Sequence, residues 1–182
     1  MKIIETDIKD LYIIEPSKFE DERGHFCESY SKAAFLKEGI DIDFVQDNQS
    51  LSKKDVIRGM HFQTGAWAQD KLVRVAKGSV IDVAIDLRPK SPTYGDGIRI
   101  FLSEENGISL LIPKGFAHGF ASLEDGTVFQ YKCSNFYNKD SESGIIYNDT
   151  ELNINWGIEN PIVSEKDLLL GSFREFEIKN GH

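Results

Sequence analysis

The segment SVIDVAIDLR, residues 79–88, has the period-two alternation of side chains that is typical of a β-strand. One face carries Ile81, Val83, Ile85 and Leu87, and the other carries Val80, Asp82, Ala84, Asp86 and Arg88. The preceding run KLVRVA, residues 71–76, reads as a second strand. The pair Lys77-Gly78 between the two runs predicts a hairpin turn.

Further short strand patterns extend in both directions from this segment. They are separated by turn residues and fall at residues 10–15, 26–30, 44–50, 56–62, 97–103, 108–113, 117–123 and 127–137. So many short strands in one chain predict a sandwich, a jelly roll or a barrel. Because we find no internal repeat and no linker, we expect one all-β domain over residues 1–182.

Helical patterns are sparse. Residues 31–38 predict a short helix with Ser31 as its N-cap and a stop at Gly39. A second short helix is expected to begin near Ser164 and to end at Gly171. We expect the last residues, 178–182, to fray.

The composition excludes several classes of protein. The net charge of −9 argues against non-specific nucleic-acid binding, and an anionic ligand would need a local basic pocket. No apolar run approaches the roughly 20 residues that span a bilayer, and charges interrupt the N-terminal MKIIETDIKD, so we expect neither a membrane span nor a signal peptide. Cys27 and Cys133 have no metal-ligand or disulfide spacing, so we expect free thiols and a cytoplasmic location.

His61 and His118 each have a structural and a catalytic interpretation. Either histidine is partly buried and hydrogen-bonded within the fold, or it acts on a ligand; a general base at His61 would need a carboxylate to orient its ring. Arg58 and His61 are three residues apart, so strict alternation places them on opposite faces. Gly59 would mark a bulge that brings both side chains into one cavity.

Asp167 and Tyr131 also remain ambiguous from the sequence. Ser164 and Asp167 have the spacing of a capping box, but the carboxylate could instead point at His61. Tyr131 shares one face of its strand with Phe129 and Cys133, where it is either a core residue with a hydrogen-bonded hydroxyl or a proton donor.

A catalytic metal is the weaker interpretation of this histidine content. The four histidines, at positions 25, 61, 118 and 182, form no His-x-His pair, and none lies within a few residues of another. A metal site generally needs three or more converging ligands. We therefore expect no metal.

Nine motifs, in order along the chain, resemble the dTDP-4-dehydrorhamnose 3,5-epimerase family, whose members have a cupin-type jelly roll. The resemblance runs from about residue 10 to about 168. The motifs are F-x-D-x-R-G-x-F-x-E (19–28), Q-D-N (46–48), R-G-M-H-F-Q (58–63), A-Q-x-K-L-V-R-V (68–75), S-P-T-Y-G (91–95), I-P-K-G-F-A-H-G-F (112–120), Y-K-C (131–133), S-E-S-G (141–144) and S-E-K-D (164–167).

The resemblance implies a role for each candidate residue. His61 matches the catalytic base, Asp167 its carboxylate partner, Tyr131 the general acid and Lys71 the cation beside the substrate C4 oxygen. Tyr137 matches the aromatic residue that stacks on thymine. The other matched substrate contacts are His118 in the sugar pocket, Arg23, Glu28, Gln46, Asp47, Asn48 and Arg58 at the nucleotide and phosphates, and Glu142 and Lys166 farther out.

The implied reaction explains these residue types. Removing hydrogens from C3 and C5 beside the C4 ketone needs a base, a donor for the enolate oxygen, and an acid on the opposite face of the sugar. The substrate would be dTDP-4-dehydro-6-deoxy-D-glucose, and no cofactor is needed because no oxidation state changes. Alternatives are a single-centre epimerase, which inverts C3 or C5 only, a sugar-nucleotide-binding protein without catalysis, and a metal-dependent cupin.

The chain departs from the family in one loop. Residues Gly65-Ala66 stand where the family usually carries a Pro-Pro pair, and Trp67 is bulkier than expected. The spacing from His61 to Lys71 is kept, so the departure bears on substrate selectivity. The resemblance also implies a homodimer that exchanges site residues between subunits, and a place in rhamnose supply for cell-wall polysaccharide or O antigen.

Overall fold

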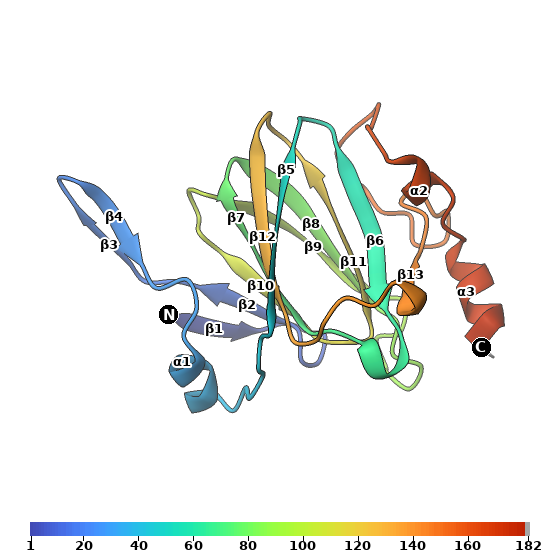
Figure 1. Cartoon of the computed structure of the whole chain (residues 1–182), viewed down its shortest axis with the longest axis horizontal. Coiled ribbons are helices and arrows are strands. Elements are labelled where there is room, and N and C mark those ends of the chain that lie inside the picture. The colour runs from blue at the N-terminus through green and yellow to red at the C-terminus, as the bar shows by residue number, and fades with distance from the viewer. Residues whose placement is uncertain (181–182) are drawn as a thin grey trace.

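Two antiparallel β-sheets face each other in a computed structural model that describes residues 1–180. The first sheet has the strand order β1 (Lys2–Glu5), β2 (Tyr12–Glu15), β10 (Ser109–Ile112), β7 (Lys71–Lys77), β12 (Thr127–Cys133) and β5 (Gln46–Ser52). The second has the order β13 (Glu142–Gly144), β6 (Ile57–Gln63), β11 (Phe116–Ser122), β8 (Ser79–Asp86) and β9 (Gly97–Ser103). This arrangement confirms the expected all-β, cupin-type jelly roll (Figure 1).

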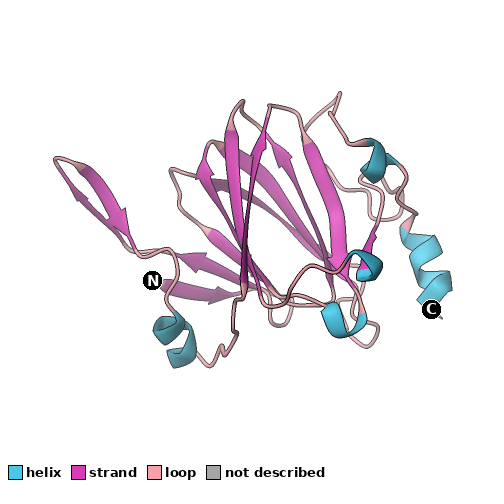
Figure 2. Cartoon of the chain, viewed as in Figure 1, coloured by secondary structure: helices cyan, strands magenta, loops and turns pink. Residues whose placement is uncertain are grey.

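The remaining elements lie at the margins of the two sheets. A hairpin of β3 (Lys18–Asp21) and β4 (Gly24–Cys27) projects away from the sandwich, on the left of Figure 1. The helices are few and short, as Figure 2 shows. They are α1 (Lys32–Lys37), the 3-10 turns η1 (Gly65–Trp67) and η2 (Lys139–Ser141), α2 (Glu165–Leu168) and α3 (Phe173–Asn180).

Several local expectations need correction. Lys77-Gly78 is a turn, with Gly78 at φ 79°, but it makes no hairpin: β7 pairs with β10 and β12, whereas β8 pairs with β11 and β9. The chain therefore crosses from one sheet to the other at this turn. The strand expected at 26–30 ends at Cys27 and that expected at 127–137 ends at Cys133.

Other elements also differ from the expectation: the helix expected to end at Gly171 is α2, which ends at Leu168, and neither β13 nor α3 was anticipated. Strands β1 and β3 were not anticipated, because each has only four residues and little hydrophobic alternation. In the segment expected to fray, residues 178–180 form the end of α3, and residues 181–182 lie outside the described residues. Phe173 is buried at the start of α3 and attaches it to the second sheet.

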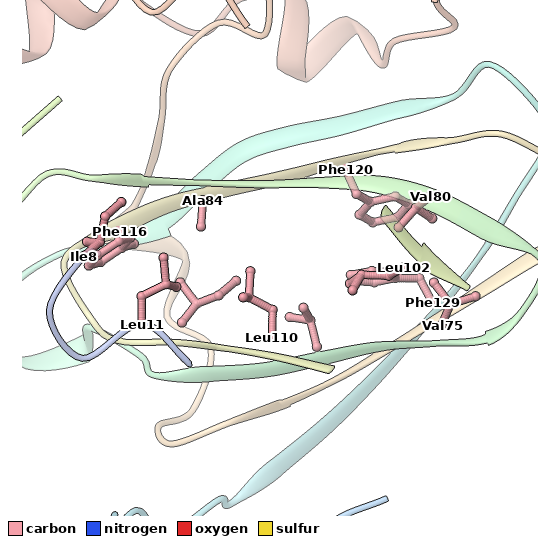
Figure 3. Packing of buried hydrophobic residues seen from close by; sticks show 12 residues of the cluster. Ile8, Leu11, Val75, Val80, Ala84, Leu102, Leu110, Phe116, Phe120 and Phe129 are labelled. Atoms are coloured by element: carbon pink, nitrogen blue, oxygen red, sulfur yellow. The ribbon is translucent and has the colours of Figure 1, made fainter. Parts of the chain in front are cut away.

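The core between the sheets explains how the two layers stay aligned. Phe120 and Ala84 of the second sheet point toward Leu110 and Val75 of the first (Figure 3). Phe120 stacks on Phe129 with 4.1 Å between ring centroids, so one aromatic pair joins the two sheets. Such face-to-face packing of inward side chains is the usual core of a β-sandwich.

Both sheets are also covered on their outer faces. Strand β8 is buried along its whole length: Val80 and Ala84 belong to the inner core, whereas Ile81, Val83 and Ile85 pack under the C-terminal segment with Trp156 and Phe173. Helix α1 covers the first sheet through Phe35. No helix among residues 1–180 is long and apolar enough to cross a membrane.

Candidate active site

A cavity of about 750 Å³ lies between the sheets and receives side chains from both. The register of β7, β12 and β5 arranges its floor in rows of directly opposed residues, which lie close enough to interact. These rows are Lys71–Cys133–Gln46, Val73–Tyr131–Asn48 and Val75–Phe129–Ser50. The expected face-sharing of Tyr131, Phe129 and Cys133 is confirmed, because all three line the cavity.

The irregularity at Gly59 brings Arg58 and His61 to the same cavity. The pairing of β6 with β11 shifts between His118 and Phe120, opposite this glycine, which has a φ of 129°. A Cβ on Gly59 would lie 2.5 Å from Cα of Gly119, so only glycine permits this close approach of the two strands. The expected bulge is therefore present, and both side chains line the cavity.

His61 is paired with a buried carboxylate. Its Nε2 lies 2.8 Å from Oδ1 of Asp167, while Oδ2 of Asp167 accepts a hydrogen bond of 3.3 Å from the backbone N–H of Gly59. Burial alone would raise the pKa of Asp167, but the hydrogen bonds from His61 and Gly59 outweigh it and hold that pKa below its usual value. An ionised carboxylate in this position orients the imidazole and stabilises its protonated form.

Asp167 also serves the helix, so both of its interpretations apply. The Ser164 hydroxyl accepts the Asp167 backbone N–H at 3.1 Å and caps α2. The backbone of Asp167 is thus fixed by the cap while its carboxylate points into the cavity. Asp167 is therefore both part of the helix N-terminus and part of the cavity lining.

A second histidine–carboxylate pair, His118 with Asp82, lies on the same sheet. His118 Nε2 is 2.9 Å from Oδ2 of Asp82, whose side chain is fully buried. The sequence analysis missed Asp82 as a site residue, because alternation along 79–88 only placed it on the less apolar face. Its signal was an aspartate four positions before another, Asp86, on a strand that the structure buries on both faces.

Lys71 and Tyr131 line the first-sheet side of the cavity. Burial lowers the pKa of Lys71, although the field of Cys133 and two carboxylates opposes the shift, and Nζ donates to the His61 carbonyl at 3.3 Å. Burial raises the pKa of Tyr131. Burial thus shifts the two groups in opposite directions: it favours the protonated phenol of Tyr131 and the neutral amine of Lys71.

Charged and polar groups surround the cavity mouth. The Tyr137 hydroxyl donates to Glu142 at 2.8 Å, and Lys166 donates to the other Glu142 oxygen at 2.6 Å. On the floor, Gln46 donates to Asn48 at 3.0 Å. Burial would raise the pKa of Glu142, but its bonds to Lys166 and Tyr137 keep that pKa low.

Arg58 adds a permanent cation at the wall of the cavity. Its Nε donates to the Ser52 hydroxyl at 3.1 Å and its Nη2 to the Leu51 carbonyl at 3.2 Å, so β5 orients the guanidinium group. The cavity gathers three cationic side chains, Arg58, Lys71 and Lys166, against the two carboxylates of Glu142 and Asp167, in a chain of net charge −9. Such a site meets the requirement for a basic pocket in an acidic protein.

Three of the expected substrate contacts do not line this cavity. Arg23 lies at the tip of the β3–β4 hairpin, where its guanidinium pairs with Asp21 and its side chain is 84% exposed. Glu28 follows the same hairpin, and Asp47 points to the opposite face of β5, where it pairs with Lys132. The other eleven expected residues line the cavity.

No three His, Cys, Asp or Glu side chains within residues 1–180 are arranged to hold a metal ion. The two histidines in the cavity each contact a carboxylate through Nε2 instead. Imidazole and carboxylate groups paired in this way suit proton transfer.

A cupin-type sandwich whose cavity holds a histidine–aspartate pair and a phenol is the architecture of an isomerase of the epimerase class. Residues 5–175 match the family model of dTDP-4-dehydrorhamnose 3,5-epimerase. The chain belongs to this family.

Individual relatives agree with the family match. A dTDP-4-dehydrorhamnose 3,5-epimerase of Escherichia coli K12 is 50% identical over 157 residues, covering 86% of this chain and 85% of its own. The crystal structure of the Bacillus anthracis enzyme of that name, with TDP and PPi bound, has a TM-score of 0.93 at 44% identity and covers 94% of this chain and 99% of its own. A Legionella pneumophila dTDP-6-deoxy-D-glucose-3,5-epimerase, in complex with dTDP-4-keto-L-rhamnose, gives 0.92 at 43%, with 98% and 95% covered.

Proposed function

We propose that this protein inverts C3 and C5 of dTDP-4-dehydro-6-deoxy-D-glucose and so forms dTDP-4-dehydro-L-rhamnose. The observation that carries the proposal is that His61, backed by Asp167, and Tyr131 come from opposite sheets and line one cavity. Relatives named for this reaction are about half identical in sequence, which supports the same chemistry here.

The residues of the cavity suit each step of the inversion. His61 takes the proton from the carbon beside the ketone, the C–H electron pair forms a C=C bond, and the ketone oxygen becomes the enolate. Lys71 holds that oxygen, in the manner of an oxyanion hole. Tyr131 then delivers a proton to the opposite face of the same carbon, which inverts it. Before the second carbon reacts, His61 releases the proton that it gained to solvent, and Tyr131 takes up a proton from solvent to replace the one that it lost.

His118 supports the reaction from the same sheet as His61. Its ring is held by fully buried Asp82, so its orientation is fixed before a ligand arrives. We assign it to a hydroxyl or the C4 oxygen of the sugar. Preorganised donors of this kind stabilise developing charge without reorganising during the reaction.

The mouth of the cavity suits the nucleoside diphosphate. Arg58 supplies a guanidinium group for a phosphate, and Lys166 a second cation. Tyr137 offers an aromatic face that is exposed at the mouth, where a thymine ring can stack. Gln46, Asn48 and Glu142 line the same stretch and provide polar contacts between base and sugar.

We also propose that the enzyme is a homodimer and that Arg23 and Glu28 serve the partner's cavity. Both lie on or beside the projecting hairpin, which exposes Phe19 to 65% and Phe26 to 70% of their surface. Two solvent-exposed aromatic rings on a protruding hairpin indicate a surface that is covered by another subunit. We place the enzyme in the cytoplasm, where its product would supply rhamnose for surface polysaccharide.

Subunit exchange tests the role of the hairpin. His61→Ala and Arg23→Ala are each expected to be nearly inactive alone. In a mixed dimer, one site then combines intact His61 with intact Arg23 of the other subunit, so mixing the two variants is expected to restore activity. If Arg23 serves the cavity of its own chain, mixing restores nothing.

Isotope incorporation tests the reaction itself. The purified protein is incubated with the keto sugar in deuterated buffer, and the product is examined by NMR after coupling to a 4-ketoreductase. We expect deuterium at both C3 and C5, and none with His61→Ala, which should still bind TDP. Label at one carbon only would identify a single-centre epimerase. Binding without any label would identify a sugar-nucleotide-binding protein.

A further inference from the structure

Gln63 holds three backbone groups from two loops that lie far apart in the sequence. It is the last residue of β6 and is 7% exposed. Its Nε2 donates to the carbonyl of Trp67 at 2.9 Å and to that of Phe136 at 3.1 Å, and its Oε1 accepts the N–H of Asn138 at 2.6 Å. The carboxamide thus uses both donors and its acceptor on backbone rather than on a ligand.

A second glutamine holds the same segment from the other sheet. Gln46 of β5 accepts the backbone N–H of Tyr137 at 3.1 Å. The Phe136 carbonyl and the N–H groups of Tyr137 and Asn138 are therefore fixed by one glutamine from each sheet. Because these three groups surround the Cα of Tyr137, the two glutamines determine where its ring stands.

The Tyr137 ring has little other support. It is 54% exposed, and its hydroxyl bonds to Glu142, itself a residue of the cavity rim. A half-exposed ring can stack on a ligand in one defined position only if the backbone that carries the ring is fixed by other contacts. The buried carboxamide of Gln63 provides this hold from the strand that also carries His61.

We propose that Gln63 is a positioning residue that fixes the 136–138 segment and, through Tyr137, the nucleobase end of the substrate. This inference rests on the proposed function, in which Tyr137 stacks on the base. Gln63 also donates to the Trp67 carbonyl, in the 65–67 turn that the sequence analysis expects to bear on selectivity. Changes in that turn would therefore reach the nucleobase end of the site through Gln63.

The test measures TDP affinity by calorimetry for wild type, Gln63→Met, Tyr137→Ala and the double variant. Methionine keeps the length of glutamine and removes all three hydrogen bonds. We expect Gln63→Met to weaken TDP binding about tenfold, since a few net hydrogen bonds order the segment. In the Tyr137→Ala background the same change should cost less than about twofold, because contacts that act through one residue are not additive.

Further measurements separate positioning from general damage. Inorganic pyrophosphate, which lacks the base, should bind Gln63→Met as it binds wild type, and kcat for deuterium incorporation should stay within about threefold while KM rises. Gln63→Glu keeps the acceptor for Asn138 but sets a buried carboxylate oxygen against the carbonyls of Trp67 and Phe136, so its TDP affinity should fall at least as far as that of Gln63→Met. This second variant tests the inference if the methionine variant fails to fold. Gln130→Met, at a partly exposed glutamine bonded to Gln49, is the matched control.

Several outcomes would overturn the inference. Equal losses of TDP affinity with and without Tyr137 would show that Gln63 acts elsewhere, as would a parallel loss of pyrophosphate affinity. Unchanged TDP affinity in both Gln63 variants would also refute it. If the wild-type protein binds neither TDP nor pyrophosphate, the proposed function itself fails, which is a distinct result.

Discussion

Replacing Asp167 by asparagine tests whether the buried carboxylate supports His61 as a base. The two side chains are 2.8 Å apart, with 6% of Asp167 and 32% of His61 exposed. For unit charges at that distance and an effective dielectric constant of about 20, Coulomb's law gives roughly 6 kcal/mol. Solvent at His61 screens part of this attraction, so we expect the transition state, in which the imidazolium forms, to lose about 3 kcal/mol. That loss corresponds to an approximately 10²-fold slower proton abstraction.

The assay is the initial rate of deuterium incorporation at C3 and C5 at saturating substrate. Asp167 also accepts a hydrogen bond from the Gly59 backbone N–H, so the variant could lose structure as well as charge. Circular dichroism is used to check that it is folded. Asp43→Asn removes an exposed carboxylate paired with Lys32 and should exchange like wild type. If Asp167→Asn stays within about fivefold of wild type, the carboxylate does not support the base and the assigned pair is wrong.

Three further changes have defined outcomes. Tyr131→Phe should slow inversion more than exchange, so that recovered substrate carries label; if both fall equally, the phenol is not the acid. Burial lowers the pKa of Lys71 and raises that of Tyr131, and the proposed reaction needs both groups protonated. We therefore expect kcat/KM to fall as the pH rises through the pKa of Lys71, which lies below the ordinary lysine value of about 10.4. Lys71→Arg should shift this alkaline limb upward, whereas an unmoved limb would assign it to another group. Gly59→Ala should lower the free energy of unfolding, measured in urea, by at least about 2 kcal/mol. The loss should exceed that of the control Gly126→Ala, since Gly126 also has a positive φ but no atom within 4 Å of an added Cβ. Equal losses would mean that the close contact between β6 and β11 does not account for the effect.

The sequence predicted well which residues of the strands line the cavity, because the signals for them are local. Alternation placed Tyr131 with Phe129 and Cys133, and a glycine between Arg58 and His61 indicated the bulge that joins them. The contact between His61 and Asp167 spans 106 positions of sequence, and only the family resemblance could pair them.

The remaining features depend on long-range packing that no local pattern carries. Lys77-Gly78 has the chemistry of a hairpin turn, yet each flanking strand finds better partners in a different sheet. Asp82 was missed as a site residue because only its contact with His118 gives it a role. Gln63 was quoted within a motif without any function, since its three backbone partners lie in two separate loops.

The stacked rings of Phe120 and Phe129 have a consequence for how such enzymes change their substrates. Phe120 lies in the layer that carries His61, and Phe129 in the layer that carries Tyr131, so the pair sets the spacing of the two layers where they line the cavity. Thinner side chains there would let the layers approach each other, and bulkier ones would wedge them apart. The gap that admits a hexose can thus be retuned without altering any group that transfers a proton.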